Sequence, residues 1–165
     1  LPGSVRTQLR EIGQSLAETR HVDSDMEALR RRHFAILDHT LDAGDDPLPF
    51  KGKTAARLHD LLAEYSADGL AFSHWVIMPN HVHLITKPCK YDSIETFKLT
   101  WRRFKARSAR YTNQIMQTKG SLWQDSLYDR WIRDEAEHRR WVKYLHNNPV
   151  KARLVERSED FLYLQ

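Results

Sequence analysis

The sequence predicts an α+β domain in which helices cover one face of an antiparallel sheet. Apolar residues recur at helical spacing along most of the chain, but residues 70–86 change to the pattern typical of strands. Hydrophobic residues make up 41% of the 165 residues, which is enough to bury a core and excludes a disordered protein. No apolar run approaches the roughly 18 residues of a transmembrane helix, so no membrane partner is expected.

Three helices are expected first, at residues 4–19, 24–42 and 54–66, because apolar residues repeat there every three or four positions. A loop rich in Pro, Gly and Asp at 43–52 separates the second helix from the third. Residues 1–53 are therefore expected to be an N-terminal helical region of the same domain.

Strands are expected at residues 70–78 and 81–86, joined by a turn at Pro79 and Asn80. The first segment is aromatic and β-branched, and the second alternates apolar and polar residues. A third strand is expected at 126–132.

Two further helices are predicted by capping-box spacing at Asp92 with Glu95 and at Asp134 with Glu137. The last helix is expected to end before Pro149, because proline disfavours helical backbone at the residue before it. The apolar line of the first of these helices is Ile94, Phe97, Trp101, Phe104, Ser108 and Tyr111.

From residue 54, the order helix, strand, strand, helix, strand, helix is that of a ferredoxin-like unit without its first strand. Either that strand precedes Leu1 in a longer protein, or the sheet is smaller than the full unit. The chain begins with Leu rather than Met, which is consistent with a fragment. Residues 54–157 are the expected core, and residues 158–165 are a C-terminal tail.

Positive charge is concentrated in one segment. The formal net charge is +4, but residues 97–124 carry +7 and no acidic residue, so the rest of the chain sums to −3. This favours partners that carry phosphate groups, whereas the alternative is the solvated face of a basic helix. The candidate phosphate-binding residues are Lys98, Arg102, Arg103, Lys105, Arg107 and Arg110.

Structural roles are expected for the cysteine, for three of the tryptophans and for His138. Cys89 is the one cysteine, which excludes an intramolecular disulfide framework and a Cys-cluster zinc site and suits a reducing cytoplasm. There is no signal-peptide pattern. Trp123, Trp131 and Trp141 are expected to be core or sheet-covering aromatics, with stacking on a base as the alternative. His138 falls on the apolar side of the last helix.

His81 and His83 form the sharpest local motif. Residues i and i+2 of a strand point to the same face, so the two imidazoles can converge on one cation. Imidazole suits first-row divalent metals, and a histidine pair leaves positions for oxygen ligands. The alternative is two exposed histidines on a polar strand face.

Tyr144 and Asn148 form the second motif, one helical turn apart on the same face. A phenol can act as a covalent nucleophile when a base or metal assists it, and an amide oxygen can ligate a metal. The alternative is a half-buried tyrosine and an asparagine that ends the helix before Pro149.

Three runs of residues together resemble a known family. WVIMPNHVHLI at residues 75–85 resembles the HUH strand of single-tyrosine, single-strand DNA transposases. LWQDSLYDRWIRDE at 122–135 and YLHNNPVKA at 144–152 resemble the branch called REP-associated tyrosine transposases. The similarity spans about residues 54–157, which would be the HUH catalytic core. The chain departs from the family by lacking its first strand.

The resemblance implies that His81, His83 and Asn148 bind a divalent cation, Mg²⁺ or Mn²⁺, and that Tyr144 is the nucleophile. Tyr111 and Tyr128 are the alternatives for the nucleophile. The implied activity is cleavage and rejoining of single-stranded DNA near short hairpin repeats through a 5′-phosphotyrosine, without a nucleotide cofactor.

The resemblance also implies single-stranded or hairpin DNA as the partner of a monomer or homodimer, in the cytoplasm of a bacterium and in association with the nucleoid. Two alternative functions remain open. One is a hairpin DNA-binding protein without catalysis, and the other is a metal-dependent hydrolase that uses water as its nucleophile.

Overall fold

A computed structural model of the chain describes residues 7, 10–11, 23–42, 49–124 and 130–165. Contacts between residues divide the chain into two compact units, 1–46 and 47–165. In the first unit, helix α2 spans Asp23–Asp42, which confirms the predicted second helix. Of the helix predicted at 4–19, Thr7, Arg10 and Glu11 are helical, and the other residues lie outside the described ones.

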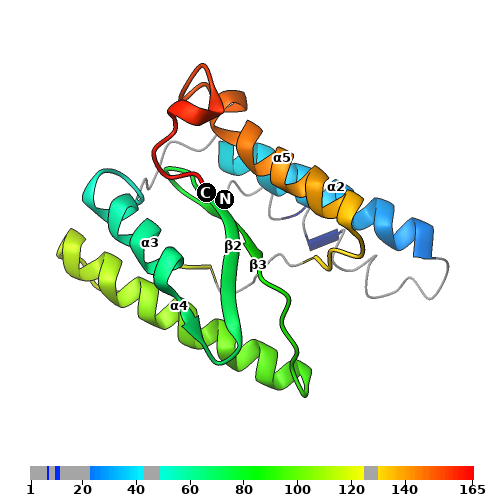
Figure 1. The fold of residues 1–165 in the computed structure, drawn as a ribbon, viewed down its shortest axis with the longest axis horizontal. Helices are drawn as coiled ribbons and strands as arrows, with labels where there is room; N and C mark the ends of the chain where they lie inside the picture. Colours follow the sequence, from blue (N-terminus) through cyan, green and yellow to red (C-terminus); the bar gives the residue numbers. More distant parts are fainter. Residues whose placement is uncertain (1–6, 8–9, 12–22, 43–48, 125–129) are drawn as a thin grey trace. The chain divides into compact units, whose positions relative to one another are not determined.

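The second unit holds the sheet and the remaining helices (Figure 1). Its strands pair in the antiparallel order β1-β2-β3, so the α+β class is confirmed. No helix in the described part of the chain combines the length and the apolar character needed to cross a membrane. The elements are α3 (Lys53–Glu64), β1 (Ser66–Ala67), β2 (Leu70–Ile77), β3 (Val82–Thr86), α4 (Ile94–Met116), α5 (Glu135–Lys151) and the short 3₁₀ helix η1 (Ser158–Asp160).

Helices cover both faces of the sheet, not one as expected (Figure 1). Trp75 and Ile77 of β2 pack with α3 and α4, whereas Val76 and Met78 pack with α5. All four side chains are buried. A strand that is buried on both faces has a continuous apolar run rather than alternation, and residues 75–78 are such a run.

The C-terminal tail contributes to the sheet, which the sequence did not predict. Trp75 and Gln165 exchange backbone hydrogen bonds of 3.3 and 3.0 Å, and the Ile77 N–H donates to the Tyr163 carbonyl at 3.1 Å. Residues 163–165 therefore lie along the edge of β2 opposite β3. Of the third strand predicted at 126–132, Arg130 and the next two residues are not in a strand, and 126–129 lie outside the described residues.

Three predicted helix ends differ in the structure. Helix α3 ends at Glu64, because the residues that follow pair with β2. Helix α4 is capped by Ser93 rather than Asp92, since the Ser93 hydroxyl accepts a hydrogen bond from the Thr96 N–H at 3.1 Å. Helix α5 continues past Pro149 to Lys151, because the N–H groups beyond Pro149 find carbonyl acceptors within the last turn.

Candidate catalytic site

The two motif histidines face each other beneath α5. His83 pairs across the sheet with Val76, whose side chain packs against α5, so both residues lie on that face. His81 immediately precedes β3. The Nε2 atoms of His81 and His83 are 3.2 Å apart, and the rings meet edge to face at 4.8 Å between centroids. The predicted shared face of the pair is therefore confirmed.

Asn80 orients His81, a role that the sequence did not predict beyond a turn. The Asn80 Oδ1 atom lies 2.8 Å from His81 Nδ1. Because a carbonyl oxygen only accepts hydrogen bonds, this contact favours the tautomer in which His81 Nδ1 carries the proton and Nε2 presents its lone pair. In this tautomer Nε2 can ligate a cation. The sequence signal for this role of Asn80 was its position next to the His-x-His motif.

Tyr144 joins the histidine pair from a distant part of the sequence. Its ring meets the His83 ring edge to face, with 5.5 Å between centroids. It also meets the Trp141 ring edge to face, with 5.4 Å between centroids. The fold thus places a phenol beside two imidazoles, which is the composition of a metal-assisted nucleophilic site.

Asn148 lies one turn beyond Tyr144 on α5 and is 1% exposed. Its Nδ2 donates to the Tyr144 carbonyl at 3.0 Å, but its Oδ1 forms no hydrogen bond within the described part of the chain. A buried amide oxygen without a partner is rare and costs free energy. An amide oxygen of this kind, like the imidazole nitrogens of the two histidines, is a ligand type that fits a divalent cation.

Of the two alternative nucleophiles, the structure describes Tyr111. Tyr111 lies on α4 and packs with the core on the opposite face of the sheet, with the Arg57 guanidinium 5.2 Å from its ring centroid. Tyr128 lies outside the described residues.

A buried ion pair at the start of α5 lies beside the Trp141 ring that contacts Tyr144. Glu137 is 5% exposed, and its Oε1 accepts from the Arg130 Nε and Nη2 atoms at 2.9 and 2.7 Å. Its Oε2 accepts from the Arg133 N–H at 3.0 Å. Burial raises the pKa of Glu137, but the hydrogen bonds from Arg133 and Arg130 outweigh it and leave this pKa lowered. The Arg130 guanidinium also lies 5.7 Å from the centroid of the Trp141 ring that contacts Tyr144.

The sequence predicted only half of this arrangement. The Asp134 carboxylate accepts from the Glu137 N–H at 2.7 Å, as in the expected capping box. The Glu137 side chain does not return to the Asp134 N–H but bonds to Arg130 and Arg133 instead. The sequence signal for this ion pair was Arg130, which lies seven residues before Glu137 on the buried side of the helix.

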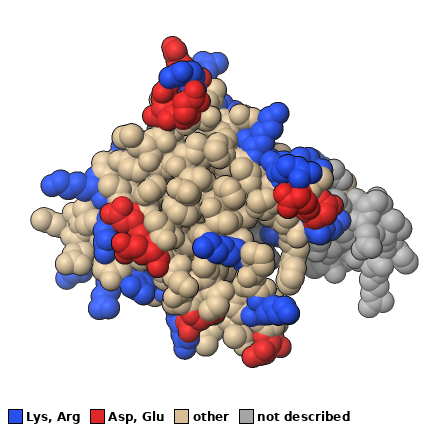
Figure 2. All heavy atoms as spheres, in the orientation of Figure 1, with Lys and Arg blue, Asp and Glu red and all other residues tan. Residues whose placement is uncertain are grey.

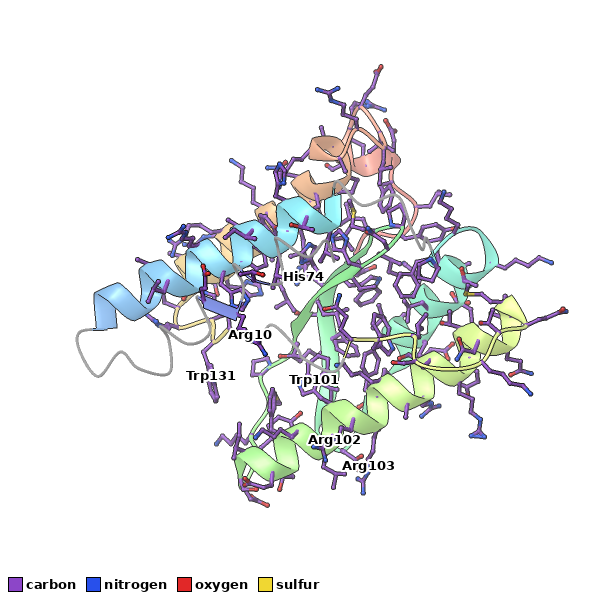
Figure 3. All side chains as sticks on the ribbon, turned by 180° about the vertical axis from the view of Figure 1, so that it is seen from behind. Arg10, His74, Trp101, Arg102, Arg103 and Trp131 are labelled. Atoms are coloured by element: carbon purple, nitrogen blue, oxygen red, sulfur yellow. The ribbon has the colours of Figure 1, made fainter. Side chains whose placement is uncertain are left out.

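The basic residues of α4 lie on the far face of the sheet from Tyr144. Figure 2 shows Lys and Arg side chains along the lower left of the view, where α4 lies, and Figure 3 shows Arg102 and Arg103 on the side of α4 away from the sheet. Arg103 pairs with Asp68 at 2.9 Å, and the Lys105 Nζ donates to the Gln124 carbonyl at 2.6 Å. The six candidates therefore do not form one uniform face; the exposed members are Lys98, Arg102, Arg103, Arg107 and Arg110.

A second group of histidines lies on another flank of α5. His74 of β2 meets His138 of α5 edge to face at 5.4 Å, beside an open pocket of about 480 Å³. Burial, and then the nearby His138 and His146, lower the pKa of His74. The other residues that line this pocket are Glu135, Arg139, Val142 and Lys143.

Residues 48–148 match the family model described as "Transposase IS200 like". The chain belongs to the IS200-like transposase family. The match includes His81, His83, Tyr144 and Asn148, and it confirms the resemblance that the three motifs indicated.

Two relatives place the chain near one branch of the IS200-like transposases. It is 30% identical over 90 residues to a "REP-associated tyrosine transposase" of Escherichia coli (strain K12), covering 53% of this chain and 48% of the relative. It is 28% identical over 94 residues to a "Putative REP-associated tyrosine transposase" of Haemophilus influenzae, covering 53% of each. The chain therefore spans about half the length of these relatives. No solved structure matches it.

Proposed function

We propose that the chain is a single-strand DNA transposase that cleaves and rejoins DNA near short hairpin repeats through a 5′-phosphotyrosine intermediate. The observation that carries the proposal is the contact of Tyr144 with His83, whose Nε2 lies 3.2 Å from that of His81. A nucleophilic side chain beside a pair of metal-ligating nitrogens is what a phosphoryl-transfer site needs.

In this proposal the Tyr144 phenol oxygen attacks the scissile phosphorus. A phosphorus–oxygen bond to the tyrosine forms and the bond to the DNA 3′-oxygen breaks. The phenol releases its proton to solvent, and the departing 3′-oxygen takes up a proton from solvent and leaves as a hydroxyl. The 5′-phosphate stays on Tyr144, and attack by a 3′-hydroxyl reverses the step and rejoins the strands. The phosphodiester energy is conserved in the tyrosine ester, so no nucleotide cofactor is required.

His81, His83 and Asn148 would hold a divalent cation, Mg²⁺ or Mn²⁺. When bound, such a cation polarises a phosphate and offsets the charge that develops on its oxygens. Asn80 keeps His81 in the ligating tautomer, and the Asn148 Nδ2 bond to the Tyr144 carbonyl ties its own oxygen to the turn that carries the phenol.

The basic face of α4 would supply phosphate contacts that position the DNA without reading its sequence. Since α4 and Tyr144 lie on opposite faces of the sheet, a DNA strand that contacts both must pass around an edge of the sheet. A flexible single strand can make this passage, whereas a duplex of persistence length near 150 base pairs resists it.

The alternative is a hairpin DNA-binding protein without catalysis. One observation favours this alternative. Among the described residues, β3, which contains His83, pairs only with β2 and so has one hydrogen-bonded neighbour.

Trapping a covalent adduct tests the proposal. The protein is incubated with Mn²⁺ or Mg²⁺ and a labelled hairpin oligonucleotide that carries single-stranded flanks, and the adduct is mapped to a peptide. We expect a phosphotyrosyl link at Tyr144, no adduct from Tyr144→Phe, and an adduct from the control Tyr111→Phe. Binding without any adduct would favour the non-catalytic alternative, and cleavage without an adduct would favour the hydrolase.

A further inference from the structure

Trp131 is the most exposed large apolar side chain among the described residues, with 82% of its surface accessible. The sequence predicted a core or sheet-covering role for it, and that prediction is wrong. Figure 3 shows the ring projecting away from the segment that precedes α5. Little of the indole contributes to packing, so the fold does not account for it.

The residues on either side of this ring are anchored to α5 and to the core beneath it. Arg130 is bonded to the buried carboxylate of Glu137, and the Arg133 N–H is bonded to the other oxygen of the same group. Ile132 packs into the cluster beneath α5. Trp131 is therefore an exposed aromatic ring on a rigid support, which lowers the entropy cost of stacking a ligand on it.

The position of Trp131 follows from the course of the chain. Leu122 and Trp123 pack with the core on the α4 face, and Ile132 packs with the core on the α5 face. Trp131 is therefore the neighbour of a residue that packs on the face that carries Tyr144.

Two contacts link this position to the candidate nucleophile. The neighbouring residue, Arg130, places its guanidinium 5.7 Å from the Trp141 ring centroid, and the Trp141 ring is 5.4 Å from the Tyr144 ring. The residue that precedes Trp131 is therefore linked to Tyr144 through a single aromatic ring.

We propose that Trp131 stacks on an unpaired base of single-stranded DNA flanking the cleaved phosphate. The inference rests on the proposed function and adds a substrate contact to it. Base–aromatic stacking tolerates any sequence, because every base has a π-face.

A single ring suits a base better than a protein partner. Within residues 130–134, Trp131 is the one apolar side chain that is mostly exposed. A tryptophan buries at most about 250 Å², whereas a stable protein interface needs about 800 Å² from each partner.

The test compares two DNA probes with the whole chain. One is a hairpin with a single-stranded flank that contains 2-aminopurine, and the other is the same hairpin without a flank. For Trp131→Ala we expect about 5- to 100-fold weaker binding of the flanked hairpin and unchanged binding of the other. Trp131→Phe should restore most of the loss and should quench 2-aminopurine as the parent does.

Leu162→Ala is the matched control, because Leu162 is also exposed, at 80%, and lies outside the site. Equal affinity of the parent and Trp131→Ala for the flanked probe would overturn the inference. So would an unchanged affinity accompanied by loss of self-association in sedimentation, which would assign the ring to a protein contact. Trp131-dependent binding without any adduct would refute the proposed function alone, and an adduct with Trp131-independent binding would refute this inference alone.

Discussion

Glu137→Gln tests whether the buried ion pair at the start of α5 stabilises the fold around Tyr144. The substitution keeps the size of the side chain but removes its charge. It removes the Glu137 carboxylate from the Arg130 guanidinium, whose side chain is 20% exposed. The Arg130 guanidinium would also no longer be held in a fixed position beside the Trp141 ring.

The structure sets the expected size of the effect. Removing one partner of a buried ion pair costs about 3–5 kcal/mol. Glutamine can still accept one hydrogen bond, and Arg130 keeps some contact with water, so we expect a loss of about 2–3 kcal/mol of unfolding free energy. For a unit of roughly 120 residues this corresponds to a fall in Tm of about 8–12 °C.

Urea denaturation at neutral pH measures the effect, and Glu135→Gln is the matched control on the same helix. Glu135 is 74% exposed and pairs with Arg139 at 3.4 Å, so its replacement should cost less than about 0.5 kcal/mol. Equal stability of the two variants would refute the conclusion that the Glu137 pair is buried and stabilising.

The pH dependence gives a second check. Because the folded-state pKa of Glu137 is lowered, its stabilising contribution is fully present above the ordinary value of 4.5 and is lost as the pH falls through the folded-state pKa. The difference between the parent and Glu137→Gln should therefore shrink in acid. A constant difference down to about pH 2 would contradict the assignment of the charge.

Three further predictions concern DNA, metal and pH. Replacing Arg102 and Arg107 by Gln should weaken binding of all single strands and reduce the slope of log affinity against log salt by about 1.4; an unchanged slope would show a merely solvated face. His83→Ala should abolish cleavage in Mg²⁺ or Mn²⁺ but leave hairpin binding nearly intact, and cleavage within about twofold of the parent would contradict a catalytic metal there. Because burial and then His138 lower the pKa of His74, unfolding free energy should fall as the pH drops below 6.5, and His74→Gln should reduce that fall in denaturation curves at about pH 5 and pH 7.5.

The local elements could be predicted from the sequence because their periodicity is a property of neighbouring residues. Strand alternation alone placed His81 and His83 on one face, and helical spacing placed Tyr144 one turn from Asn148. The motifs that contain these residues also indicated the family, and the family match confirms it.

Only the tertiary structure decided how these pieces meet. Packing of α5 on the Val76 face brings Tyr144 to His83, and no local pattern specifies which face a helix covers. Pairing of residues 163–165 with β2 depends likewise on a partner that is distant in sequence. The partner of Glu137 was also decided by the fold. Its capping spacing predicted a bond to a backbone N–H, but in a buried place the charged Arg130 guanidinium is the stronger partner. Trp131 is exposed for the complementary reason, because apolar character predicts burial only where the fold offers a surface to cover the ring.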